Sequence, residues 1–183
     1  LVSPVGRAKK NSILLTDLDI MEMYLDIAKY IFNQGYMSKL LSSITGQRIQ
    51  IKNACGGYGK VMAVYPEGNI YMCQSLTSEE YRIGNILSDT AEAVMAEIEK
   101  KLKDEKIKKT FCVDYKEICN QCEYKYVCPG KCPVSYTQDD YSCYFVKKMI
   151  NYQLFQKKDY SSSEDELKEF ISYLETIIEE YKK

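Results

Sequence analysis

The chain contains no histidine, although its 183 residues include eight cysteines. Histidine is the usual proton shuttle of catalysis and the commonest metal ligand of proteins. Its absence excludes Ser-His-Asp and Cys-His catalysis from this chain. It also excludes every zinc site that combines cysteine with histidine. A metal bound here would therefore be held mainly by thiolates.

The chain also lacks an excess of charge and a long apolar run. Its 25 Lys and Arg residues balance 26 Asp and Glu residues, so no global field favours nucleic acid. No apolar run approaches the length of a membrane span, and the opening LVSPVGRAKKNSILL has no signal-peptide layout. We expect a cytoplasmic, globular protein that binds neither nucleic acid nor membrane. Because the sequence does not begin with Met, we also expect it to be a piece of a longer protein.

Helical periodicity dominates the first region, residues 1–48. Thr16 is a suitable N-cap, and Gly35 is a suitable stop for the helix that begins after it. A shorter helical segment is expected over residues 37–44. The apolar stripe of the first helix consists of Leu18, Met21, Leu25, Ala28 and Phe32.

The middle of the chain alternates extended and helical patterns. Residues 49–87 contain two short β-rich runs around Pro66-Glu67-Gly68, which predict a hairpin. The glycines of CGGYG, beside Cys55, permit sharp turns. A helix is expected over residues 89–107, with Asp89 and Glu92 at its cap. One face of this helix carries Val94, Met95, Ile98 and Leu102.

Residues 110–143 are rich in cysteine and weak in periodicity, which predicts a loop region held by something other than an apolar core. Two helices are expected after Cys143, and the sequence SSSEDE is suited to cap the second of them. The apolar side of that second helix comprises Leu167, Phe170, Ile171, Leu174, Ile178 and Tyr181.

The eight thiols are open to three interpretations. A disulfide framework suits the even count, but such frameworks are typical of small secreted domains with little core. Two all-thiolate zinc sites are a second interpretation, although the chain has only one C-x2-C pair, Cys119 and Cys122. Iron–sulfur clusters are the third, because four cysteines commonly hold each [4Fe–4S] cluster. Eight cysteines would serve two such clusters.

The spacing of seven cysteines resembles the signature of the SPASM domain, a C-terminal extension of many radical S-adenosylmethionine (SAM) enzymes. Cys55, Gly68 and Cys73 form C-x12-G-x4-C, and a second group follows with the pattern C-x2-C-x5-C-x3-C. The phrases YPEGNIYMCQS, YRIGNI and PVGRAKKN add to the resemblance. The second group is Cys119, Cys122, Cys128 and Cys132, and a last cysteine, Cys143, completes the signature.

The resemblance implies two auxiliary [4Fe–4S] clusters. By position, one cluster would take Cys55, Cys73 and Cys132. Its fourth ligand varies within the family: it is an extra cysteine, or the site stays open for a substrate thiol. We assign Cys112, which lies outside the signature, as this ligand, with a buried free thiol as the alternative. The other cluster would take Cys119, Cys122, Cys128 and Cys143. Without clusters, we expect disorder, zinc or adventitious disulfides in this region, with Cys119–Cys122 and Cys128–Cys132 as the local pairs.

One departure from the radical enzymes is important. They cleave SAM at a cluster held by C-x3-C-x2-C in an N-terminal barrel, and this chain has no such triplet. We therefore expect it to be inactive alone and to work beside the barrel of its parent chain, where SAM would bind.

The roles that the resemblance implies for this chain are electron transfer and help in binding a peptide or protein substrate, as in enzymes that mature peptides by thioether or other crosslinks. The alternatives are a domain of a formylglycine-forming sulfatase activator and a zinc-stabilised binding module without a redox role.

The resemblance also implies an organisation. Residues 1–48 would be the connector and the end of the barrel, residues 49–150 the SPASM domain, and residues 151–183 a helical extension. The expected fold class is α+β: a small β-hairpin scaffold with cysteine-rich cluster-binding loops and flanking helices. Residues 1–48 are expected to present an apolar stripe without a partner, which predicts self-association.

Overall fold

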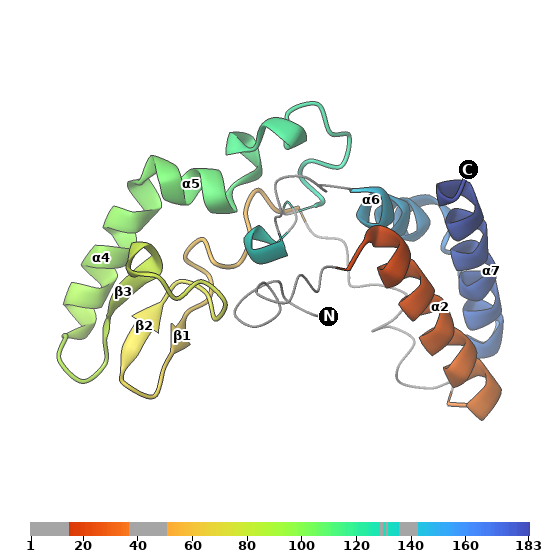
Figure 1. Ribbon diagram of the computed structural model, residues 1–183, viewed down its shortest axis with the longest axis horizontal. Helices are drawn as coiled ribbons and strands as arrows, with labels where there is room; N and C mark the ends of the chain where they lie inside the picture. Colours follow the sequence, from red (N-terminus) through yellow and green to blue (C-terminus); the bar gives the residue numbers. More distant parts are fainter. Residues whose placement is uncertain (1–14, 37–50, 129, 131, 136–142) are drawn as a thin grey trace. The chain divides into compact units, whose positions relative to one another are not determined.

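The computed structural model of the chain describes residues 15–36, 51–128, 130, 132–135 and 143–183. These residues form two compact units (Figure 1). The first unit consists of the described residues between 51 and 135, and the second of residues 15–36 and 143–183. The helix expected over residues 37–44 lies outside the described residues.

The second unit begins with α2 (Asp17–Gln34), and the caps expected from the sequence are confirmed. The Asp19 backbone N–H donates to the Thr16 hydroxyl at 3.2 Å, and the Asp19 carboxylate accepts from the Thr16 backbone N–H at 2.8 Å. Gly35 ends the helix with a φ of 69°, a left-handed conformation that glycine adopts without strain. Local sequence is therefore enough to fix both ends of this helix.

The described part of the second unit continues with α6 (Tyr144–Asn151), the π-helical turn η5 (Tyr152–Gln156) and α7 (Ser163–Tyr181). Ser162 caps α7 as the sequence predicts. Figure 1 shows α2 alongside α7, and the two helices share one apolar core. The fully buried members of this core include Met21, Ala28, Tyr152, Leu167, Phe170 and Leu174.

The packing against α7 changes the expectation for the N-terminal stripe. Met21 and Ala28 have no exposed surface, because α7 covers this face of α2. Lys29 and Glu175 add an ion pair across the two helices at 2.7 Å. The reason given for self-association, a stripe without a partner, therefore does not hold for residues 17–34.

A buried carboxylate joins α2 to the start of α6. Asp17 is only 5 % exposed, and its carboxylate oxygen accepts from the Phe145 backbone N–H at 3.2 Å. Backbone N–H groups in the first turn of a helix have no partner within the helix. The Asp17 carboxylate accepts from one of these groups, the N–H of Phe145, which is two residues after Cys143. This hydrogen bond holds the start of α6 against α2.

The first unit contains a three-stranded antiparallel sheet in the order β1-β2-β3 (Figure 1). The strands are β1 (Ala63–Val64), β2 (Asn69–Tyr71) and β3 (Arg82–Asn85). The predicted hairpin is confirmed, because β1 and β2 pair with Val64 opposite Ile70. Gly68 stands in the turn with a φ of 85°, where its backbone N–H donates to the Tyr65 carbonyl at 2.8 Å.

The helix expected over residues 89–107 is two helices in the structure. They are α4 (Ala91–Lys103) and α5 (Glu105–Phe111), and Asp104 both ends the first and caps the second. The N-cap of α4 is Thr90, so the expected cap at Asp89 is wrong; Asp89 instead accepts from the Asn85 backbone N–H at 2.7 Å.

The apolar face predicted for this helix is only partly buried in α4. One member of the predicted face, Met95, is 54 % exposed. The remaining members, Val94, Ile98 and Leu102, pack against the core of the first unit.

The described residues thus have an α+β fold, with helices beside a small antiparallel sheet. The core of the first unit is built on Ile70, Met72, Ile83, Ile107 and Phe111. Among the described helices, none is long and apolar enough to cross a membrane. The expected domain boundaries at residues 48 and 150 stay a prediction.

Replacing Asp17 by Ala tests the link between α2 and α6. We expect Asp17→Ala to lower the free energy of unfolding by about 1–3 kcal/mol, because the Phe145 N–H would lose its acceptor in a buried place. Urea unfolding followed by far-UV circular dichroism measures the change. Asp26→Ala, which removes an exposed carboxylate from the same helix, is the control and should have little effect. Equal losses in the two variants would contradict this role of Asp17.

Candidate metal centre

The centre of the first unit is a backbone bridge between two segments that are far apart in sequence. Ala54 and Cys112 face each other as an antiparallel bridge. The Cys55 N–H donates to the Phe111 carbonyl, and the Val113 N–H donates to the Asn53 carbonyl, both at 2.9 Å. The bridge brings Cys55 and Cys112, two of the predicted ligands of the first cluster, onto neighbouring backbone segments.

Gly57 makes this approach possible. Phe111 is fully buried, and a Cβ atom added to Gly57 would overlap its ring. The sequence CGGYG was expected to provide turns, and Gly59 does so with a φ of 73°. Gly57 has a different purpose: it lets the backbone after Cys55 pass directly over Phe111.

Cys112 itself is buried at the end of α5. Burial raises the pKa of the Cys112 thiol above its usual value, and the nearby Tyr58 side chain acts in the opposite direction. The Tyr58 hydroxyl donates to the Leu102 carbonyl at 2.6 Å. A thiol in this place is protected from solvent, as a ligand or a packing residue would be.

Cys73 follows the hairpin. It lies two residues beyond β2, half-buried, and forms an isolated bridge with Leu76. The Ser75 backbone N–H points to the Cys73 sulfur at 3.5 Å. Hydrogen bonds of this kind to a ligating sulfur are one means by which proteins tune metal centres.

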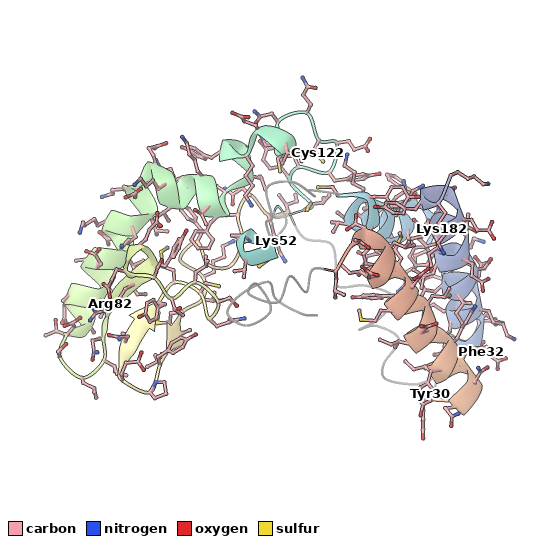
Figure 2. The ribbon with its side chains drawn as sticks, viewed as in Figure 1. Tyr30, Phe32, Lys52, Arg82, Cys122 and Lys182 are labelled. Carbon is pink, nitrogen blue, oxygen red and sulfur yellow. The ribbon has the colours of Figure 1, made fainter. Side chains whose placement is uncertain are left out.

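Short turns carry the next three cysteines. The 3₁₀ turns η2 (Val113–Tyr115) and η3 (Glu117–Cys119) follow α5 directly. The Cys122 N–H then donates to the Cys119 carbonyl at 3.2 Å, and the Cys128 N–H donates to the Tyr124 carbonyl at 2.8 Å. Figure 2 labels Cys122 on this loop, which the sequence correctly predicted to be irregular.

Two contacts attach this loop to the rest of the first unit. The Lys52 backbone N–H donates to the Tyr126 carbonyl at 2.7 Å, close before the Ala54 bridge. Asp114 accepts from the Tyr126 hydroxyl at 3.0 Å and pairs with the Lys125 ammonium at 2.8 Å. Hydrogen bonding to Lys125, and then to Tyr126, holds the pKa of the Asp114 carboxyl below its usual value. The loop is thus fixed at both the bridge and η2.

Lys116 is the buried cation of this region. It is the residue that joins η2 to η3 in the chain, and only 6 % of its surface is exposed. Burial lowers the pKa of the Lys116 ammonium, and the nearby thiols oppose this shift. The thiols whose charge acts on this ammonium are Cys119, Cys55, Cys128 and Cys132.

A surface pocket of about 590 Å³ adjoins Lys116. It combines apolar walls with two lysines, one glutamate and hydroxyl groups. The Tyr81 and Thr110 hydroxyls lie 3.5 Å apart. The lining includes Leu76, Tyr81, Lys109, Lys116, Glu117 and Ile118.

All eight cysteines are among the described residues, and none forms a disulfide. Seven belong to the first unit, with Cys132 exposed and the others buried or half-buried. Cys143 belongs to the second unit, where it is the residue before α6. Among the described residues, no group of three or more Cys, Asp or Glu side chains lies close enough together to hold one metal ion. The two predicted ligand sets therefore stay predictions.

Comparisons with models of known protein families, with curated protein sequences and with solved structures found no match for this chain.

Lys116 is the residue that sequence reasoning missed. A lysine in a loop is normally solvated, and nothing in its own sequence neighbourhood marks it as buried. Its position between Cys112 and Cys119 was the only available signal. The burial depends on how the loop folds against Val113 and Gly130, which is a tertiary property.

Substitution of Gly57 tests the close packing at the bridge. Gly57→Ala should lower the free energy of unfolding by about 1–3 kcal/mol, because the new methyl group meets the buried Phe111 ring. Urea denaturation of the metal-free chain measures this loss.

Gly56→Ala is a matched control, because its Cβ would lie 3.5 Å from Val61, an ordinary contact. If both alanines had the same effect, the general flexibility of glycine would explain it, and the contact with Phe111 would not.

Proposed function

We propose that this chain is the auxiliary-cluster part of a radical SAM enzyme of the SPASM type, and that it binds two [4Fe–4S] clusters. The observation that carries the proposal is the buried Lys116 ammonium in the cysteine-rich region, which lies 2.8 Å from the Cβ position of Gly130, between Cys128 and Cys132 in the sequence. The charges of Cys55, Cys119, Cys128 and Cys132 favour its charged form. Thiolates bring negative charge, and a buried cation among them is matched to such a group. The cysteine spacing, without any histidine, supports the same conclusion.

The donor set fits the chemistry of such clusters. Each iron of a four-iron cluster takes one thiolate, so the ligands of a cluster lie farther apart than those of a single ion. Ligation and folding of the loops would be coupled, as at other metal sites of loop-rich proteins.

We assign Cys55, Cys73, Cys112 and Cys132 to one cluster. The backbone bridge between Ala54 and Cys112 supports this set, because it holds Cys55 and Cys112 on adjacent segments. The second set is Cys119, Cys122, Cys128 and Cys143, and its support is the spacing alone.

When bound, such clusters supply one-electron transfer. The chain's own groups would hold the clusters by thiolates, donate N–H groups to sulfur as Ser75 does to Cys73, and limit the access of water. The pocket beside Lys116 offers apolar and charged surface for part of a peptide or protein substrate. We propose peptide maturation, such as thioether or other crosslinking, rather than formylglycine formation, with SAM cleavage performed by the N-terminal barrel of the parent chain.

A zinc-stabilised binding module is a second candidate. The turn in which the Cys122 N–H donates to the Cys119 carbonyl resembles the knuckle of thiolate zinc sites. Bound metal distinguishes the two candidates, because zinc brings neither colour nor labile sulfide.

The first test is metal and acid-labile sulfide content after anaerobic reconstitution, together with a visible spectrum. We expect about eight iron and eight sulfide per chain, with a brown charge-transfer band, because eight thiolates serve two four-iron clusters. About two zinc without sulfide would overturn the proposal in favour of the zinc module.

Cys112→Ser then tests the fourth ligand of the first set. We expect the iron content to fall towards about four per chain, because one cluster loses a thiolate while the second keeps its four. Val113→Ala is the control: it removes buried volume beside the bridge but leaves every thiol in place. An undiminished iron content in Cys112→Ser would show that Cys112 is a packing residue.

A further inference from the structure

Lys116 is costly to bury unless something compensates its charge. Taking an ammonium group out of water costs free energy, and proteins usually expose the ends of lysine side chains. Lys116 is nevertheless 6 % exposed, at the junction of two short 3₁₀ turns. The fold therefore places a positive charge inside the cysteine-rich region.

Thiols are among the groups that act on this charge. Cys119, Cys55, Cys128 and Cys132 all favour its charged form, against the effect of burial. Two of these thiols belong to each of the proposed ligand sets. The flanking acidic residues Asp114 and Glu117 are exposed, and Asp114 pairs with Lys125.

Gly130 leaves room for the Lys116 ammonium group because it has no side chain. A Cβ atom on Gly130 would lie 2.8 Å from Lys116 Nζ, and the backbone of Gly130 has a φ of 73°. Any other residue would be strained there and would press on the ammonium. In the sequence, Gly130 stands two residues after Cys128 and two residues before Cys132, and these two cysteines belong to different proposed ligand sets. The Lys116 ammonium is therefore close to a residue that lies next to both sets along the chain.

We propose that Lys116 is a positioning residue whose fixed positive charge stabilises the thiolate-bound metal centre and raises its reduction potential. The inference rests on the proposed function. A four-iron core bound by four thiolates is net negative, and reduction adds one further negative charge. A cation in a buried place favours both the assembled and the reduced form, because charges interact strongly away from water. Net charge and burial are among the factors that set the potential of such clusters.

Lys116→Met removes the charge and keeps an unbranched side chain. In the reconstituted chain, titrated with dithionite as the electron donor and followed by electron paramagnetic resonance, the midpoint potential should become more negative than in the wild type. Release of iron to a chelator should become about tenfold faster, as expected for the loss of one buried charge interaction. Lys116→Gln is measured beside it, so that the test survives if the Met variant fails to fold.

Two variants separate charge from structure. Lys116→Arg keeps the positive charge and should recover most of the wild-type potential and iron retention. Lys103→Met removes an exposed lysine from α4, outside the cysteine-rich loop, and should leave the potential unchanged. An unchanged potential in the neutral variants, or an Arg variant that behaves as they do, would overturn the proposal.

Failure of the proposed function would give a different result. If the wild-type chain takes up zinc but no iron and sulfide, the cluster assignment fails while the charge argument can still be measured. A zinc ion bound by four thiolates is also net negative. Lys116→Met and Lys116→Gln should then bind Zn²⁺ about tenfold more weakly than the wild type, and equal affinities would reject the role of Lys116.

Discussion

The backbone bridge between Ala54 and Cys112 is the constraint on which the first unit depends. Its two hydrogen bonds join segments that are separated in sequence by the hairpin and by helices α4 and α5. The bridge therefore requires that the hairpin and the two helices bring residue 112 back beside residue 54. The fully buried Phe111 ring packs against Gly57 next to this bridge. Cysteines on both sides of a long excursion become neighbours without any covalent link between them.

Beyond the bridge, the character of the packing changes. Residues before Cys112 contribute to a continuous apolar core, whereas the turns that follow are held by backbone hydrogen bonds, by Asp114 and by the contact between Lys52 and Tyr126. Hydrogen bonds in exposed turns contribute little net stability. A loop region of this kind gains most from a bound metal, because ligation replaces the missing core.

Local signals in the sequence were sufficient for local structure. Thr16 and Gly35 mark both ends of α2 by side-chain and backbone chemistry that needs no tertiary partner. The hairpin at Gly68 was predictable for the same reason. The break at Asp104 was not predictable, because its cap competes with a helical pattern that continues on either side.

The roles of Gly57 and Lys116 could not be predicted from the sequence, because they depend on which distant residues the fold brings against them. The division of the eight thiols into two ligand sets was suggested by a resemblance, and the geometry supports only the proximity of Cys55 and Cys112.

The buried cation and the thiols depend on each other in a way that links metal binding to folding. Metal binding removes the thiol protons and leaves thiolates. The negative charge that compensates Lys116 thus arises in the step that also closes the loops. Burial of the Lys116 ammonium has an electrostatic cost, and the thiolates that ligation creates reduce it. The free energy of metal binding would then include the relief of that cost, in addition to the bonds from metal to sulfur.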